Sequence, residues 1–229
     1  MKLPSKNVYQ ILKEKGVNNI HHANSVITSC QFLRNGALLS RDSIVRRGLF
    51  QTPQYSDHID KKYGIWPDIF TDSVDIHDRK RNINYYGPVL LVLDINFLEK
   101  IDGGLVWVTK LNPVKWNETN DDKRWFTSIS DLEKHFIKGE FDQMIVFRNC
   151  GGELSIKECL TQIILDDSQQ ETREAGPHYF KTANDAIKLS MIEGGINVPI
   201  IKRKCSNQCS CVDSYTKDSK RTKIMYSFN

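Results

Sequence analysis

The chain has 229 residues, of which 39% are hydrophobic and 26% are charged, and its formal net charge is +4, as in many ordinary globular proteins. Its longest apolar run, Pro88 to Leu93, is too short to span a membrane, and its first six residues lack the apolar core of a signal peptide. We therefore expect an intracellular, cytoplasmic protein without a membrane partner.

The first third of the chain is predicted to be mainly helical. Apolar residues recur at helical spacing behind Ser5, behind Asn24 or Ser25, and behind Ser40, and each of these polar residues is a suitable N-cap. Glycines follow each run and are expected to end the helices. We expect helices over 5–15, 26–35 and 41–47, a short strand over 20–23, and a loop over 51–67 that is a candidate binding surface.

Strands are predicted to dominate the middle of the chain. We expect them over 68–76, 89–95, 105–109, 143–148 and 161–165, with a helix over 130–137 and a polar loop over 112–127. Beyond these lie a predicted helix over 182–193, a strand over 198–201 and a last strand over 224–228. The pattern predicts an α+β fold with N-terminal helices and a mainly antiparallel, partly split sheet. We assign residues 1–180 to one domain and 181–229 to a C-terminal extension packed on it.

The C-terminal tail is basic and rich in cysteine. Residues 200–229 carry seven Lys or Arg side chains against two Asp, which suits either a solvated end or a nucleic-acid contact. Three of the chain's six cysteines, Cys205, Cys209 and Cys211, lie close together in this tail, and His178 is a possible fourth ligand for zinc. The alternative is unpaired thiols in a loop. We favour the thiols, because a Cys-x-Cys pair strains a single tetrahedral site, and so expect no zinc.

One glutamate follows a double-glycine break in the middle of the chain. An apolar run over 144–147 leads into Gly151 and Gly152, and Glu153 comes directly after them. Two glycines let the backbone pass close to a ligand, so the carboxylate can face a cleft. The alternative is a loop glutamate between two strands. The chain contains no phosphate-binding glycine loop, no His-Glu-x-x-His pair and no nucleophile elbow.

The order of several motifs resembles that of DarT-like ADP-ribosyltransferases. His22 at a strand, a helix, and the segment Gly36-Ala37-Leu38-Leu39-Ser40 are similar to the opening of that family. The strand and turn from Phe70 to Arg79, the segment Tyr86-Gly87-Pro88-Val89, and Glu153 follow in the family's order. The resemblance covers about residues 18–166. Ser25 stands where the family has a second histidine, and the family's Arg-Pro pair after the Phe70 strand is absent.

The resemblance implies an ADP-ribosyltransferase-like fold over residues 1–180 and NAD as co-substrate. Breaking the nicotinamide–ribose bond builds positive charge on the sugar, as in glycoside cleavage, and a carboxylate can stabilise that charge. We expect the following roles: Glu153 as that carboxylate, His22 and Ser40 in the NAD site, Arg79 as the pyrophosphate clamp with Arg46 and Arg47 behind it, Tyr86 stacked on nicotinamide, and His77 on the substrate side. Each residue also has a structural alternative, as a core side chain or an exposed helix end.

The resemblance further implies a nucleic-acid base as acceptor and a toxin or phage-defence role, with a possible antitoxin partner. Two aromatic loops, with Tyr55, Tyr63 and Trp66 in one and Trp116 and Trp125 in the other, suit a stacked single strand. One alternative keeps the chemistry but modifies a protein side chain. The other is a non-enzymatic nucleic-acid-binding module in which Glu153 is structural.

Overall fold

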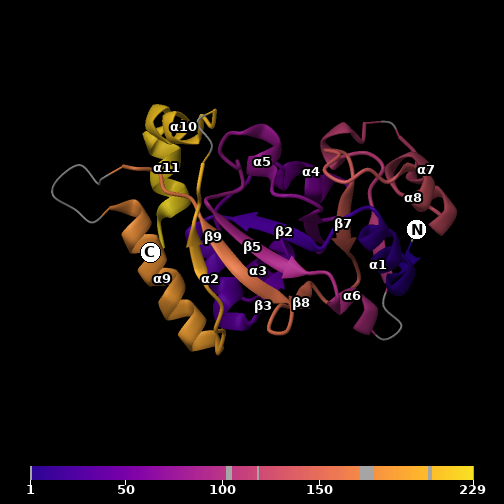
Figure 1. Cartoon of the computed structure of the whole chain (residues 1–229), viewed down its shortest axis with the longest axis horizontal. Helices are drawn as coiled ribbons and strands as arrows, with labels where there is room; N and C mark the ends of the chain where they lie inside the picture. The colour runs from indigo at the N-terminus through magenta and orange to yellow at the C-terminus, as the bar shows by residue number, and fades with distance from the viewer. Residues whose placement is uncertain (1, 102–104, 118, 171–177, 206–207, 229) are drawn as a thin grey trace.

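The computed structural model describes residues 2–101, 105–117, 119–170, 178–205 and 208–228, and these residues form ten strands and eleven α-helices (Figure 1). The strands are β1 (Leu3–Pro4), β2 (Asn19–Asn24), β3 (Ala37–Leu39), β4 (Ile69–Asp72), β5 (Val89–Asp94), β6 (Leu105–Val108), β7 (Met144–Phe147), β8 (Glu153–Ser155), β9 (Leu160–Leu165) and β10 (Ile200–Lys202). The helices are α1 (Ser5–Glu14), α2 (Val26–Asn35), α3 (Arg41–Arg46), α4 (Asp57–Lys62), α5 (Ile76–Lys80), α6 (Phe97–Lys100), α7 (Asp121–Arg124), α8 (Ile129–His135), α9 (Tyr179–Gly194), α10 (Cys211–Lys217) and α11 (Ser219–Tyr226), with a short 3₁₀ turn η1 (Pro113–Lys115). None of the helices in the described residues is both long and apolar enough to cross a bilayer.

The large sheet has the strand order β1-β6-β7-β4-β2-β5-β9-β10. Its pairs are antiparallel except the edge pair β9–β10, which confirms the predicted mainly antiparallel sheet. The apolar run of β5 is buried on both faces, which fixes this strand at the centre beside β2. Away from this sheet, β3 pairs with β8 as a separate two-stranded ribbon, in which Leu39 lies opposite Glu153.

Helices α2 and α3 begin at their predicted capping residues, Ser25 and Ser40, whereas α1 has Pro4 rather than Ser5 at its N-cap position. Ser25 occupies the N-cap position of α2, and Gly36, with φ of +61°, ends that helix in the left-handed region. At α3, the Ser40 hydroxyl accepts a hydrogen bond from the Ser43 N–H at 3.1 Å. The predicted helices over 5–15, 26–35 and 41–47 are therefore confirmed, with ends that differ by a residue or so.

Three local predictions are wrong. Residues 51–67 hold a helix, α4, and residues 224–228 begin within α11 rather than forming a strand. In α11 the buried residues are Thr222, Met225 and Tyr226, a helical spacing that a short apolar run does not distinguish from a strand. The tryptophans of the 112–127 segment do not lie in an exposed loop, because Trp116 and Trp125 pack with Ile65, Met144 and Val146 in a second core cluster.

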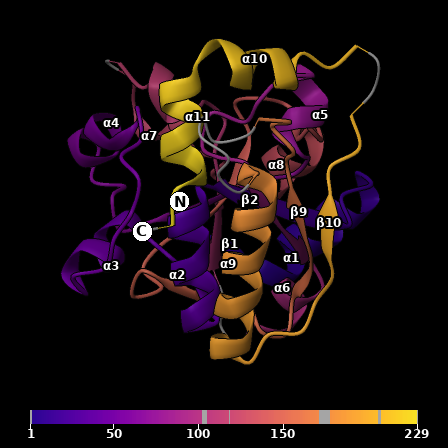
Figure 2. The same ribbon diagram turned by 90° about the vertical axis from the view of Figure 1, so that its left-hand side faces the viewer.

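The C-terminal helices pack directly on the rest of the chain. Figure 2 shows α9 beside α2 along much of their length, with α10 and α11 beyond one end of α9. Gly194 lies so close to the Leu33 carbonyl that a Cβ at this position would overlap it. Tyr215 and Tyr226 are buried in the main core cluster, which also contains residues of α1, α2 and the large sheet. One core thus spans residues of both the 1–180 and 181–229 segments.

Candidate functional site

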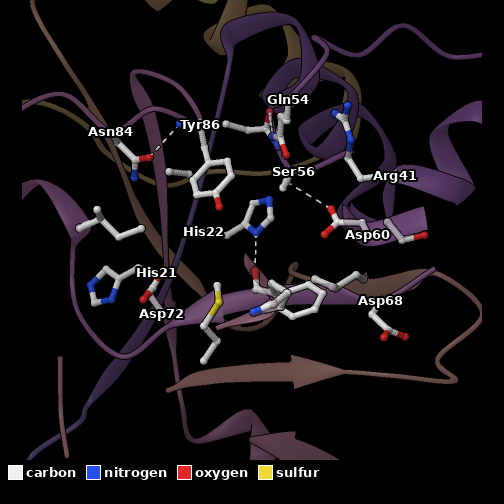
Figure 3. Close-up of a pocket in the computed structure, with 18 of the residues that line it drawn as sticks. His21, His22, Arg41, Gln54, Ser56, Asp60, Asp68, Asp72, Asn84 and Tyr86 are labelled. Atoms are coloured by element: carbon white, nitrogen blue, oxygen red, sulfur yellow. Dashed lines mark hydrogen bonds between the residues drawn. The ribbon is translucent and has the colours of Figure 1, made fainter. Parts of the chain in front are cut away.

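A pocket opens between β2, β4 and the segment around α4 (Figure 3). Its empty volume is about 900 Å³, a figure that includes space open to solvent. His22 of β2 stands in its middle, with Tyr86 on one side and Asp60 and Asp68 on the other. The paired antiparallel strands β2 and β4 form the floor of the pocket. In this pairing His21 lies opposite Asp72.

His22 presents an unpaired ring nitrogen to this pocket. Its Nδ1 lies 2.8 Å from the Phe70 carbonyl oxygen, so Nδ1 carries the proton and donates it, and Nε2 keeps its lone pair. Burial lowers the pKa of His22, and Arg41 lowers it further, against the raising effect of the Phe70 carbonyl. Nε2 is buried and has no hydrogen-bond partner among the described residues. His22 is therefore a neutral acceptor for a ligand hydroxyl.

Tyr86 directs its hydroxyl toward His22 (Figure 3). Its backbone N–H donates to Asn84 Oδ1 at 3.0 Å, and the next residue, Gly87, runs so close to the Asn24 backbone that a side chain has no room there. Burial, together with Asp72 and Asp60, raises the pKa of the Tyr86 hydroxyl to about 12. The Tyr86 hydroxyl is therefore protonated at neutral pH and can donate a hydrogen bond to a ligand, while the Tyr86 ring offers an apolar surface.

Three carboxylates that the sequence did not single out also line the pocket. Burial raises the pKa of Asp60 to about 6, of Asp68 to about 7 and of Asp72 to about 6. Arg148 contacts Asp68 at 2.8 Å and lowers the Asp68 pKa again, whereas Asp60 accepts only the Ser56 hydroxyl at 3.3 Å among the described side chains. Asp60 was missed because its segment was expected to be a loop, and α4 turns it inward.

The raised pKa of Asp60 predicts a pH-dependent effect on stability. A carboxyl whose folded-state pKa is about 6 favours folding below its unfolded pKa of 3.8, and this contribution is lost as the pH rises through 6. The free energy of unfolding of Asp60→Asn, relative to that of the wild type, should therefore increase by about 1–2 kcal/mol as the pH rises from 4 to 8, after allowance for the partial exposure of Asp60. Urea unfolding at both pH values measures the gain, with Asp185→Asn as control because Asp185 is an exposed residue of α9. An equal difference at both pH values would contradict the prediction.

Two neighbouring residues at the start of α3 also line the pocket, one predicted and one missed. Ser40 is held by its backbone N–H, which donates to the Gly152 carbonyl at 2.8 Å. Arg41, the residue that sequence reasoning missed, directs its guanidinium away from His22 (Figure 3). It donates to the Thr52 carbonyl at 2.9 Å and to Asp57 at 2.6 Å. Arg41 immediately follows the Leu-Leu-Ser segment, and this adjacency was the available signal.

Glu153, Arg46 and Arg47 lie together at the outer side of the ribbon β3–β8 and do not line the pocket. Glu153 forms an ion pair with Arg47, and its side chain is 43% exposed. Arg46 pairs with Asp42 at 2.6 Å and reaches the Gly151 carbonyl at 3.5 Å. Leu39, which lies opposite Glu153 in the ribbon, and Ser40 do line the pocket, so the cluster adjoins the pocket without lining it. The structure thus places Glu153 beside the pocket, in an ion pair with Arg47.

Arg79 and His77 also lie outside the pocket lining. The Arg79 guanidinium is 3.5 Å from Asp72, donates to the Gly139 carbonyl at 3.1 Å and packs over Phe141, so it supports the wall from behind. His77 is buried and turned toward the cysteines of the tail. His178, the expected partner of those cysteines, lies instead 3.8 Å from Asp167 at the start of α9.

A second groove adjoins the pocket and shares Ser56, Asn84 and Tyr86 with it. Its walls include Tyr55, which is 77% exposed, and Tyr85, which is 52% exposed. The Arg221 guanidinium of α11 stacks on both rings, at 4.8 Å from Tyr55 and 4.6 Å from Tyr85. The groove therefore combines exposed aromatic faces with positive charge.

Comparison with protein-family models finds no match for this chain, and comparison with curated proteins finds none either. Any inference about function therefore depends on the residues of the chain and their arrangement.

Proposed function

We propose that this protein is an NAD-dependent mono-ADP-ribosyltransferase. The observation that carries the proposal is the neutral, buried His22, whose Nε2 has no partner within the described part of the chain and faces the pocket beside the Tyr86 hydroxyl. A ribose hydroxyl is the kind of ligand group that such an acceptor and donor pair binds. The order of motifs from His22 to Glu153 supports the same reading.

The arrangement of the sheets supports an ADP-ribosyltransferase-like split core. The eight-stranded sheet among the described residues contributes β2 and β4 to the pocket, and the separate ribbon β3–β8 carries Ser40 and Glu153 along its edge. We propose that these two sheets are the two halves of that core, with the NAD site between them.

The pocket residues fit the charge of this co-substrate. NAD supplies a cationic nicotinamide, which leaves when the bond to the ribose breaks and an acceptor takes its place. Asp68 and Asp72 are paired with Arg148 and Arg79, whereas Asp60 has only the Ser56 hydroxyl among the described side chains. Above its pKa of about 6 the Asp60 carboxylate makes the inner pocket suitable for positive charge. Arg41 is the arginine among the described residues that line the pocket, and we propose it in place of Arg79 for a phosphate contact. Its guanidinium is paired with Asp57 and turned away from His22 in this structure, so it has to exchange Asp57 for the phosphate.

Glu153 is proposed to stabilise the positive charge that develops on the ribose and to orient the attacking group. A substrate bound beside His22 has to extend past Ser40 to reach Glu153, because Glu153 does not line the pocket. The Glu153 carboxylate also has to exchange Arg47 for the substrate, because the two side chains are paired in this structure. Both are partly exposed, and exposed ion pairs are weak, so the exchange costs little free energy.

A nucleic-acid acceptor is supported by the groove beside the pocket. Exposed Tyr55 and Tyr85, with Arg221 between them, provide a stacking surface with positive charge for a single strand. Trp116 and Trp125, which we expected to stack on bases, are buried and do not contribute. A toxin or phage-defence role, with an antitoxin partner, follows from the same acceptor and stays part of the proposal.

Removing the ring of His22 should weaken NAD binding. His22→Ala deletes the Nε2 acceptor, and loss of one such hydrogen bond corresponds to a roughly 10-fold higher Kd. Calorimetric titration with NAD measures the change, with His135→Ala as control because that histidine is 56% exposed. Tyr86→Phe, which removes only a hydroxyl, covers the case in which His22→Ala does not fold. Unchanged affinity in both folded variants would contradict the proposed site.

Removing the exposed tyrosines should weaken binding of single-stranded nucleic acid. Base stacking on one aromatic side chain contributes about 1–3 kcal/mol, so Tyr85→Ala should raise the Kd roughly 5- to 150-fold. Fluorescence anisotropy with a labelled oligonucleotide measures this. Phe50→Ala is the control, because it removes an aromatic ring that lies outside the groove and is more exposed than Tyr85, at 75% against 52%. A transferase that modifies protein side chains would show no salt-dependent oligonucleotide binding in the first place.

A further inference from the structure

The strongest unassigned feature of the molecule is a cluster of one histidine and three cysteines, none of which lines the pocket. His77 lies in the first turn of α5, Cys205 follows β10, and Cys209 and Cys211 lie at the start of α10. One ligand atom from each of the four residues lies within 4.8 Å of every other. Two segments more than 120 residues apart in sequence thus bring their metal-binding atoms to one point.

We propose that one structural zinc ion is bound by four side chains: His77, Cys205, Cys209 and Cys211. A tetrahedral zinc site with the usual bond lengths places sulfurs about 3.8 Å apart and a sulfur about 3.5 Å from a ring nitrogen. The distances around this point are 3.3 Å for Cys205 Sγ to Cys211 Sγ, 3.1 Å for Cys209 Sγ to His77 Nε2, and 3.8 Å for Cys205 Sγ to His77 Nε2. Small shifts convert this cluster into that geometry.

The surroundings of the cluster suit a bound cation. The Cys211 backbone N–H points at Cys209 Sγ at 3.5 Å, which stabilises negative charge on that sulfur and lets two cysteines one residue apart face the same point. The other ring nitrogen of His77, Nδ1, is buried and has no hydrogen-bond partner among the described residues. The exposed Asp78 carboxylate lies 3.7 Å away, so a small movement of that side chain would supply the outer partner that zinc-binding histidines commonly have. His77 and Cys211 are buried, so the site is closed on one side.

The donor set indicates a structural role and zinc in particular. Three thiolates and one imidazole select a soft, tetrahedral ion, and four protein ligands leave no open position for a substrate. The ion would tie the C-terminal segment to α5, whose first residue, Ile76, lines the pocket. The inference is independent of the transferase proposal, since it concerns the attachment of the tail and not the chemistry of NAD.

The fourth ligand, His77, could not be identified from the sequence because it is distant from the cysteines along the chain. The spacing Cys205-x3-Cys209-x-Cys211 supplies only three ligands, and from the sequence the nearest upstream histidine, His178, is only a possible fourth. In the fold, His178 lies at the N-terminus of α9 beside Asp167, and the histidine at the cysteines is His77.

The test is the metal content of the full chain, purified without added metal and without chelator. Elemental analysis should give about one zinc per chain; no bound metal, or iron in its place, would overturn the proposal. His77→Asn and Cys209→Ser should lose the zinc, whereas His178→Asn and Cys150→Ser should retain it. Retention of zinc in His77→Asn with loss in His178→Asn would also overturn the ligand assignment.

A second measurement covers variants that fail to fold. Cobalt exchanged into the wild-type chain should give intense visible bands and thiolate-to-metal absorption in the near ultraviolet, which report tetrahedral sulfur ligation. Weak bands typical of oxygen ligands would overturn the proposal. So would a disulfide between Cys205 and Cys211, found by mass spectrometry of the alkylated native protein, because it removes two of the ligands.

Discussion

Glu153→Gln is expected to lower the rate of ADP-ribosyl transfer roughly 10²–10³-fold, the usual effect of removing one group that stabilises transition-state charge. Gln keeps the size of the side chain and removes only its charge. Glu153 is partly exposed at the edge of the ribbon β3–β8, so the substitution should leave the fold and the melting temperature nearly unchanged. The measurement is nicotinamide release and label transfer under single-turnover conditions.

Two control variants make the Glu153 result specific. Glu158→Gln removes an exposed carboxylate five residues away in the same region and should retain full activity. Asp60→Asn tests the other carboxylate that could stabilise the ribose cation, since Asp60 lines the pocket and Glu153 does not. Loss of activity in Asp60→Asn with full activity in Glu153→Gln would contradict the role given to Glu153.

Arg203→Met is expected to destabilise the fold by about 3–5 kcal/mol, the usual result of removing one partner from a buried ion pair. The Arg203 side chain is 7% exposed and forms ion pairs with Asp75 and Asp166. Burial lowers its pKa, but the two carboxylates outweigh this and hold the pKa above its ordinary value. The Tyr215 hydroxyl also donates to Asp166, at 2.6 Å. Methionine would leave two buried carboxylates without their cation.

Urea denaturation measures this loss as a lower transition midpoint with an unchanged slope. Arg34→Met is the matched control, because Arg34 pairs with Glu193 at a partly exposed site, where side chains are 38% and 45% exposed. That pair should contribute less than about 1 kcal/mol. Equal effects of the two substitutions would contradict the buried network. The result also matters for the tail, since Arg203, counted in the basic excess, is not free to contact nucleic acid.

Local sequence patterns predicted individual helices and strands better than they predicted which elements pack against one another. Helical spacing and capping residues identified α1, α2 and α3, and the apolar run of 89–95 identified the central strand β5. These features depend on residues close in sequence, which is the range that periodicity describes. The mistaken strand at 224–228 shows the limit, because a few apolar residues at a chain end fit either period.

The candidate site could be predicted only in part, since it is assembled from distant segments. His22, Ser40 and Tyr86 were singled out and do line one pocket. Asp60 required the unpredicted helix α4. His77 looked like part of a charged turn, and nothing in its neighbours indicates that the fold carries Cys205, Cys209 and Cys211 to it. Contacts between such distant residues depend on strand order and helix packing, which leave no signal in the nearby sequence.

The most direct test of the proposed function is transfer from labelled NAD onto three acceptor pools: single-stranded DNA, RNA and total protein. Wild type and Glu153→Gln are compared side by side. The transferase proposal predicts label on a nucleic-acid pool with the wild type and its loss with the variant; label on protein alone would replace the acceptor. No label on any pool, with no NAD consumed, would contradict the proposal and leave a binding module in which His22 and Glu153 are structural.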